Sequence, residues 1–301
     1  MSQPLRAIAF VGTGIMGAHM ARRLAEAGFR VRAWNRTAAK AETLVAHGVE
    51  VAPSARAAAA EADAVVCMLS SGPVCDAVLG GKDGVIAAMR EGAVLVVMSS
   101  IPVETARAQA EACARRGLRY VDAPVSGGER GAATGALAIM AGGEAGTVDA
   151  LAPLFAPLGR ATHVGPAGSG QLAKLANQLI VASNICAVAE ALLLAEHGGA
   201  DPARVREALL GGFADSTVLR QHGERMVRGD FVPGGPAKYQ VKDTTTALRL
   251  ARSQGLRLPI AMAVDRLFQD LVDNGGADLD HSAVIAELRR ANSPAETPEE
   301  V

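Results

Sequence analysis

The pattern GxGxxG occurs near the start of the chain, in the six residues from Gly12 to Gly17. It follows a short apolar run, Arg6–Val11, and opens a segment with helical spacing, Ile15–Ala27. In a strand–turn–helix unit, the first glycine permits a tight turn and the second lets backbone approach a pyrophosphate. The third allows the helix to pack closely on the strand. The alternative is a glycine-rich turn that binds nothing. Because a second apolar run follows at the expected distance, we predict a dinucleotide-binding loop consisting of Gly12, Thr13, Gly14, Ile15, Met16 and Gly17.

Short apolar runs alternate with helical segments through the first half of the chain. Ala64–Leu69 and Ala93–Met98 are continuous apolar runs with the length of buried parallel strands. A helix is expected after Pro53, with Ser54 as its N-cap. This alternation predicts a parallel sheet covered by helices on both faces.

The pattern changes after residue 165. From Gly170 to His197, apolar residues recur at helical spacing for about seven to eight turns. Further helical segments follow, with no convincing strand: Pro202–Leu210, Thr217–Val227, Tyr239–Ser253, Ile260–Asn274 and His281–Ala291. We therefore predict an α/β chain with an N-terminal Rossmann-like doubly wound sheet in residues 1–165. An all-helical domain in residues 166–301 would follow, joined to it by one long helix.

The balance of charge and the cysteine positions argue against nucleic-acid and membrane partners and favour a reducing compartment. The chain has 30 basic and 31 acidic residues, whereas a nucleic-acid or anionic-membrane surface needs a basic excess. The apolar stretch Leu172–Ala195 is interrupted by charged and amide side chains, which favours a buried helix over a membrane span. The four cysteines are scattered, no signal peptide is evident, and a reducing cytoplasm is expected.

The end of the second predicted strand bears on cofactor choice. An Asp or Glu here would accept from a ribose 2′-hydroxyl and repel a 2′-phosphate. The chain instead has Asn35, Arg36 and Thr37, with Lys40 one turn on. Because a guanidinium suits a phosphate by charge and by its forked donors, we predict NADPH over NADH. The alternative is that Arg36 is only a solvated surface charge.

A segment rich in glycine and proline, Asp122–Gly128, follows the short strand Arg119–Val121. We expect it not to continue as regular structure. The hydroxyl of Ser126 and the backbone amides of Gly127 and Gly128 would make a small anion cradle, suited to a carboxylate. An ordinary turn fits the same residues equally well.

Lys174 lies in the first turns of the long apolar helix, with Asn177 and Gln178 three and four residues later. These side chains project from one face of the helix. A lysine and two amides on an otherwise apolar helix need partners if they are buried. The alternative is a helix end exposed to water. The six histidines show no metal-ligand spacing, and no metal is expected.

Four segments, in order, carry a family resemblance: Gly12–Gly17, Asp122–Gly128, Gly168–Gly170 leading to Lys174 and Asn177, and Lys242-Asp243. On these the chain resembles the 3-hydroxyisobutyrate (β-hydroxyacid) dehydrogenase family over nearly its whole length. Within the family it looks most like the tartronate semialdehyde reductase branch. The supporting stretches are Lys174–Gln178, Gly211-Gly212, Ser216–Leu219 and Asp280–Ala283.

The resemblance implies a hydride transfer between a nicotinamide cofactor and a small carboxylate-bearing aldehyde or 3-hydroxyacid. It implies that Lys174 is the catalytic acid/base, that Asn177 and Gln178 orient the substrate, and that Ser126, Gly127 and Gly128 bind its carboxylate. Lys242 would close over the cofactor, and the nicotinamide ribose would be lined by Met68, Leu69, Ser99 and Ser100. Because the family is usually oligomeric, the resemblance implies a homo-oligomer, and a homodimer or homotetramer is expected.

Three other interpretations stay open. Imine reductases share the two-domain plan but usually lack the lysine, and a decarboxylating phosphogluconate-type enzyme would need a longer helical domain. A cofactor-binding scaffold or redox sensor on the same fold would need neither Lys174 nor Ser126. Two features depart from the family: Asn35 stands where an acid is frequent, and the loop Gly234–Gln240 could shape a different substrate pocket.

Overall fold

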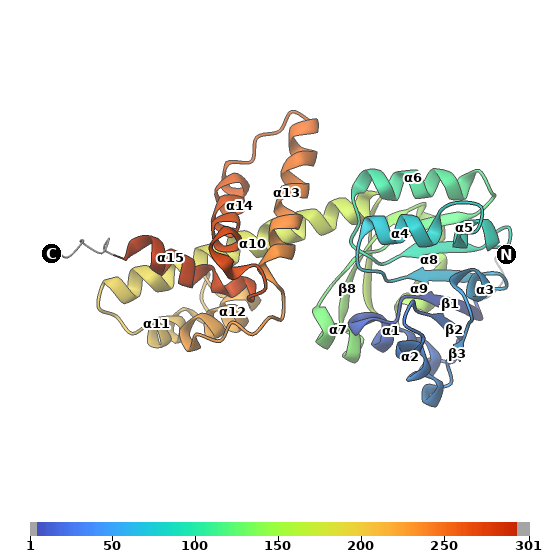
Figure 1. The fold of residues 1–301 in the computed structure, drawn as a ribbon, viewed down its shortest axis with the longest axis horizontal. Helices are drawn as coiled ribbons and strands as arrows, with labels where there is room; N and C mark the ends of the chain where they lie inside the picture. The colour runs from blue at the N-terminus through green and yellow to red at the C-terminus, as the bar shows by residue number, and fades with distance from the viewer. Residues whose placement is uncertain (1–4, 294–301) are drawn as a thin grey trace, which may run out of the picture. The chain divides into compact units, whose positions relative to one another are not determined.

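The computed structural model describes residues 5–293. The chain forms two compact units, one up to Lys174 and one from Leu175 onward. The first contains a sheet with helices, and the second is made of helices, which confirms the expected fold class (Figure 1).

Six parallel strands form the main part of the sheet, in the order β3-β2-β1-β4-β5-β6. They are β1 Ala7–Val11, β2 Arg30–Trp34, β3 Glu50–Val51, β4 Ala64–Cys67, β5 Val94–Val97 and β6 Arg119–Asp122. The strand order reverses at β1 and β4, as in a doubly wound sheet.

The prediction of a parallel sheet is confirmed for these six strands and is wrong at the far edge of the sheet. This edge holds β7 Val125–Ser126, β8 Leu137–Gly143 and β9 Gly159–Gly165. Strand β8 runs antiparallel to β6 and β7 and parallel to β9. The residues between β7 and β8, 127–136, are too few for the crossover that a parallel connection needs.

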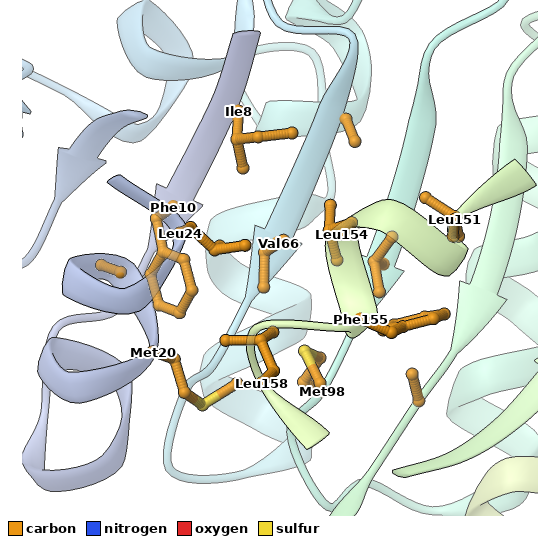
Figure 2. Packing of buried hydrophobic residues seen from close by; sticks show 14 of the residues in the cluster. Ile8, Phe10, Met20, Leu24, Val66, Met98, Leu151, Leu154, Phe155 and Leu158 are labelled. Atoms are coloured by element: carbon orange, nitrogen blue, oxygen red, sulfur yellow. The ribbon is translucent and has the colours of Figure 1, made fainter. Parts of the chain in front are cut away.

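Each face of the sheet packs a different set of helices. In β1, Ile8 and Phe10 point to one face while Ala9 and Val11 point to the other, as the two-residue period of a strand requires. Helices α1 Ile15–Glu26, α8 Ala145–Ala150 and α9 Ala152–Phe155 cover the first face, where Phe10, Met20, Leu24, Leu154 and Phe155 pack together (Figure 2). The other face is covered by α3 Ala55–Ala59, α4 Gly72–Leu79, α5 Val85–Ala88 and α6 Val103–Ala114.

Local signals in the sequence account for several helix ends. Ser54 caps α3, because its hydroxyl accepts from the Ala57 amide at 3.0 Å. Helix α2, Ala38–Glu42, is followed by a short 3-10 turn, Val45–His47. Gly48 ends that turn with a positive φ of 78°, a conformation that glycine adopts without strain.

The second unit is built around α10 Ser169–His197. The other elements are α11 Pro202–Leu209, α12 Thr217–Arg228, α13 Ala237–Ser253, α14 Pro259–Leu271, η2 Val272–Gly276, η3 His281–Ala283 and α15 Val284–Asn292. No named strand occurs between Leu175 and Ser293 in the described part of the chain. Buried residues of α10, among them Ile185 and Leu192, join Phe268 of α14 and Val284 of α15 in one apolar core.

Helix α10 is long and apolar enough, by length and composition alone, to cross a membrane. One face of it lies in the core just described, yet only 39% of its most apolar stretch is buried. Ile180 and Leu194 are 63% and 76% exposed in the single chain. The expected burial of this helix therefore holds for one face only.

Candidate functional site

At two of the three glycine positions in the glycine loop, no larger residue fits without a clash. Gly12 has a φ of 103°, and a Cβ there would clash with the carbonyl oxygen of Met68. A Cβ at Gly17 would clash with the carbonyl oxygen of Gly12. At Gly14, in contrast, a Cβ would meet nothing within 4 Å. Gly12 and Gly17 thus serve the packing of β1, α1 and the β4 end, while Gly14 borders open space.

The start of α1 offers unpaired donors. Gly14 is the N-cap residue, and no side chain accepts from the first amides of the helix. Ile15, the first helical residue, is 73% exposed although it is apolar, and the buried hydroxyl of Thr13 has no partner among the described residues. Uncapped helix amides and the helix dipole favour an anionic group. The residues present therefore fit the pyrophosphate of a dinucleotide.

Asn35 at the end of β2 organises this loop. Its Oδ1 accepts from the Thr13 amide at 3.1 Å, and its Nδ2 donates to the Thr37 carbonyl at 3.0 Å. The side chain thus joins the glycine loop to the turn after β2, leaving the side chains of Arg36 and Thr37 exposed.

The turn after β4 lies against the glycine loop, since Met68 contacts Gly12. Met68, Leu69 and Ser100 are partly exposed. Ser99 is fully buried, and its hydroxyl accepts from the Leu69 amide at 2.7 Å. Ser99 therefore supports this turn from the protein interior and has no exposed surface with which to line a ribose.

Asp122 joins the end of β6 to the start of α10. Its Oδ1 accepts from the Gly168 amide at 2.7 Å, and its Oδ2 accepts from the Gln171 amide at 2.8 Å. Burial raises the pKa of this carboxyl, and the backbone donors Gly168 and Gln171 offset only part of that rise. The carboxylate thus satisfies backbone amides that a helix start leaves without partners.

The side chain of Gln171 continues this network to the end of β5. Its Oε1 accepts from the Ile101 amide at 3.0 Å, and its Nε2 donates to the Ser99 carbonyl at 2.9 Å. The ends of β5 and β6 and the start of α10 are therefore held together by two buried side chains, Asp122 and Gln171. Neither role was predicted from the sequence. The spacing did place Gln171 on the same helix face as Lys174, because it lies three residues before it.

The segment from Ser126 to Gly128 is more regular than expected. Val125–Ser126 forms β7, and α7 Gly128–Thr134 starts directly after Gly127. The strand before this segment ends at Asp122, as expected, but regular structure resumes at Val125. Gly127 and Gly128 take positive φ angles of 134° and 60°, which let the chain turn from strand to helix within two residues. Ser126 is half-buried, and both glycines are exposed.

Polar residues on α10 and α13 form a chain of contacts. Lys174, Asn177 and Gln178 are half-buried on one face of α10. Asn177 donates to Gln178 at 2.9 Å, and Gln178 donates to Asp243 of α13 at 2.7 Å.

Asp243 also fixes Lys242, whose Nζ lies 3.0 Å from the Asp243 carboxylate. The fold thus brings Asn177 and Gln178 close to Lys242, and Asp243 links them. From the sequence, a role was predicted for Lys242 but not for Asp243.

Two family models match the chain. The NAD-binding domain of 6-phosphogluconate dehydrogenase matches residues 7–165. The NAD-binding model of NADP-dependent 3-hydroxyisobutyrate dehydrogenase matches residues 168–288.

Relatives match over nearly the whole length. The chain is 44% identical to 2-hydroxy-3-oxopropionate reductase of Escherichia coli K12, over 93% of this chain and 96% of that protein. It is 33% identical to glyoxylate/succinic semialdehyde reductase 1 of Arabidopsis thaliana, over 94% of this chain and 98% of that protein.

A solved structure, 3-hydroxyisobutyrate dehydrogenase of Mycobacterium tuberculosis with L-serine, has a TM-score of 0.85 to this chain. It is 33% identical over 95% of this chain and 99% of that chain. An imine reductase from Pseudomonas, 18% identical with a TM-score of 0.59, shares the fold alone. The chain therefore belongs to the 3-hydroxyisobutyrate dehydrogenase family, whose members are oxidoreductases that use a nicotinamide cofactor.

Proposed function

We propose that the protein reduces a small carboxylate-bearing aldehyde, tartronate semialdehyde or a close analogue, with NADPH, and that Lys174 is the general acid/base. The supporting observation is the network of Asp122 and Gln171. It fixes the start of α10 to the ends of β5 and β6, one helical turn before Lys174. A rigid support of this kind keeps a proton donor at a constant position.

The nicotinamide ring, when bound, supplies the hydride. Lys174 would donate a proton from its Nζ to the carbonyl oxygen as negative charge develops there, and would take it back in the oxidation direction. The hydroxyl of Ser126 and the amides of Gly127 and Gly128 would hold the substrate carboxylate. Asn177 and Gln178 would orient the substrate, with Gln178 itself held by Asp243.

The preference for NADPH rests on the end of β2. Arg36 and Thr37 are exposed, and Asn35 uses its side chain on backbone groups of the two adjoining turns. No acidic side chain stands at residues 35–37 to repel a 2′-phosphate. A guanidinium with two forked donors would therefore meet that phosphate. The role of Lys242 at the cofactor stays a prediction, as do the cytoplasmic location, the homodimer or homotetramer, and the domain boundary at residue 165.

A spectrophotometric assay at about 340 nm, where reduced nicotinamide absorbs, tests the proposal. The purified protein would be mixed with NADPH or NADH and a panel of aldehydes: tartronate semialdehyde, succinic semialdehyde, glyoxylate and methylmalonate semialdehyde. We expect Lys174→Ala to lower kcat by about a thousandfold. Lys174→Arg should do the same, because it keeps the charge but does not release a proton near neutral pH.

Lys82→Ala, at an exposed lysine between α4 and α5, is the matched control and should leave turnover unchanged. Cofactor binding, followed by NADPH fluorescence, should persist in all three variants. Turnover that survives in Lys174→Ala would remove this lysine from the mechanism. Bound cofactor with no turnover of any carboxylic aldehyde would bring imine reduction or a sensor role forward.

A further inference from the structure

Two histidines that lie 59 residues apart in the sequence meet in the helical unit. His222 is on α12 and His281 opens η3. Their Nε2 atoms are 3.3 Å apart, and the rings meet edge to face with centroids 4.5 Å apart. The two Nε2 atoms therefore lie close enough to bind one ligand together. Spacing along the sequence did not reveal this pair.

The distance between the two nitrogens matches a metal-ligand pair. Zinc binds imidazole nitrogen at about 2.0–2.1 Å, so two ligands at a tetrahedral angle are about 3.3 Å apart. A direct hydrogen bond between the two rings also fits this distance. A metal titration distinguishes the two possibilities.

Asp280 lies next to the second ring nitrogen of His222, the one that does not face His281. Its Oδ1 lies 3.6 Å from the His222 Nδ1, which is buried and has no hydrogen-bond partner among the described residues. Histidines that bind metal usually direct their second ring nitrogen at a carboxylate or carbonyl, which fixes the ring and strengthens the ligand.

The carboxylate is itself firmly held. Asp280 is 1% exposed; its Oδ1 accepts from the hydroxyl of Ser282 at 2.6 Å, and its Oδ2 accepts from the Gly234 and Gly235 amides at 2.9 and 3.1 Å. Gly235 lies against the His281 ring, where a Cβ would come within 3.2 Å of the ring Cε1. The two imidazoles are thus supported by a fixed carboxylate and by a close backbone contact.

The charges around the two histidines favour metals that bind nitrogen over metals that bind oxygen. The Arg225 guanidinium lies 3.1 Å from the Asp280 Oδ2, so this cation and the carboxylate balance each other. A dication is therefore not drawn in by net negative charge, and its binding depends on the imidazole nitrogens. Such a site favours Zn²⁺, Ni²⁺ or Cu²⁺ over Mg²⁺ and Ca²⁺, which prefer oxygen ligands.

We propose that His222 and His281 form a binding site for an imidazole-preferring divalent metal such as Zn²⁺, with Asp280 orienting His222 and water completing the coordination. Both histidines are half-buried, so solvent reaches the pair. A metal bound there bridges α12 and η3, and it stabilises the helical unit because it binds the folded chain only. The site uses none of the residues assigned to hydride transfer.

A titration of the full-length protein, freed of metal with a chelator, tests the site. Co²⁺ is the probe, because its visible absorption reports tetrahedral nitrogen ligands, and Zn²⁺ is then added as competitor. We expect one Co²⁺ bound per chain and displaced by Zn²⁺, with no displacement by Mg²⁺. The melting temperature should rise with Zn²⁺ and not with Mg²⁺.

His222→Ala and His281→Ala should each abolish the cobalt spectrum and the thermal shift. His222→Gln removes the ligand while keeping a polar side chain, so it guards against loss through misfolding. His197→Ala, at an exposed histidine that ends α10, is the control and should bind as the unaltered chain does. Absence of binding in the unaltered protein overturns the proposal, and so does equal binding in the folded His222 variants.

Discussion

The carboxylate of Asp122 and the backbone amide of Gln171 lie 2.8 Å apart, which ties the end of β6 to the first turn of α10. We expect Asp122→Asn to place an amide NH₂ opposite a backbone N–H and so to lower the free energy of unfolding by about 1–3 kcal/mol. Denaturant unfolding measures this change. Asp149→Asn, at an exposed position in α8, should leave stability unchanged.

The same pair should affect catalysis through Lys174. Gln171→Met keeps the side-chain volume but loses the bonds to Ile101 and Ser99. We expect kcat to fall by about tenfold or more while the KM for NADPH changes little, because the helix start loses a fixed position rather than a cofactor contact. A rise in KM alone would show that Gln171 acts on binding.

The three glycines of the first loop should separate stability from cofactor binding. Gly17→Ala forces a methyl against the Gly12 carbonyl and should destabilise the fold by about 1–3 kcal/mol. Gly14→Ala meets no protein atom within 4 Å and has an ordinary φ of −71°, so the melting temperature should stay unchanged. The methyl would nevertheless occupy the space expected for the pyrophosphate. Loss of NADPH fluorescence enhancement in a fully folded Gly14→Ala would meet this expectation, and unchanged affinity would contradict it.

Arg36 should account for selection between the two cofactors. Removing a charge-assisted contact worth about 1.5–3 kcal/mol should raise the KM for NADPH by about 10- to 100-fold and leave the KM for NADH unchanged. Steady-state kinetics of Arg36→Ala with both cofactors measure this. Arg30→Ala, at the exposed start of the same strand, is the control. Equal effects on both cofactors would mean that Arg36 does not bind the 2′-phosphate.

Alkaline pH should weaken the fold through two buried thiols. Burial raises the pKa of Cys113 and of Cys186 from 9.0 to about 12. A thiol whose folded pKa is raised contributes its stability below pH 9 and loses it progressively as the pH rises toward 12. By pH 10 the two thiols together should cost about 3 kcal/mol.

Chemical unfolding at pH 8 and at pH 10 checks this effect. A Cys113→Ala, Cys186→Ala double variant should lose less stability between the two pH values, whatever its stability at pH 8. Burial also raises the pKa of Tyr120 above its ordinary 10.0, so its loss of stability begins only as the pH approaches 10, the upper limit of this window. Identical losses in both proteins would assign the alkaline sensitivity to other groups.

Local signals were sufficient for the parts of the fold that short segments determine. The Gly12–Gly17 loop, the Ser54 cap and the length of α10 each depend on neighbours within a few residues, and they could be predicted. The contacts of Asp122 with Gln171 and of Gln178 with Asp243 join residues 49 and 65 positions apart. Only the folded chain defines such pairs. The sequence places Gln171 on the same helix face as Lys174, but it does not reveal the partners of Gln171 or of Asp243. The antiparallel direction of strand β8 escaped prediction for a related reason, because an apolar run gives no information on strand direction.

The turn between β9 and α10 has an evolutionary consequence. Gly168 and Gln171 must both reach the single carboxylate of Asp122, and a side chain at Gly170 would collide with the Asp122 and Met140 carbonyls. Selection can therefore change neither the length of this turn nor the size of its residues without losing the contact that fixes α10. Insertions and deletions among homologues should accumulate in other connections, such as the exposed loop between α13 and α14, where a Cβ at Gly255 would meet no atom within 4 Å.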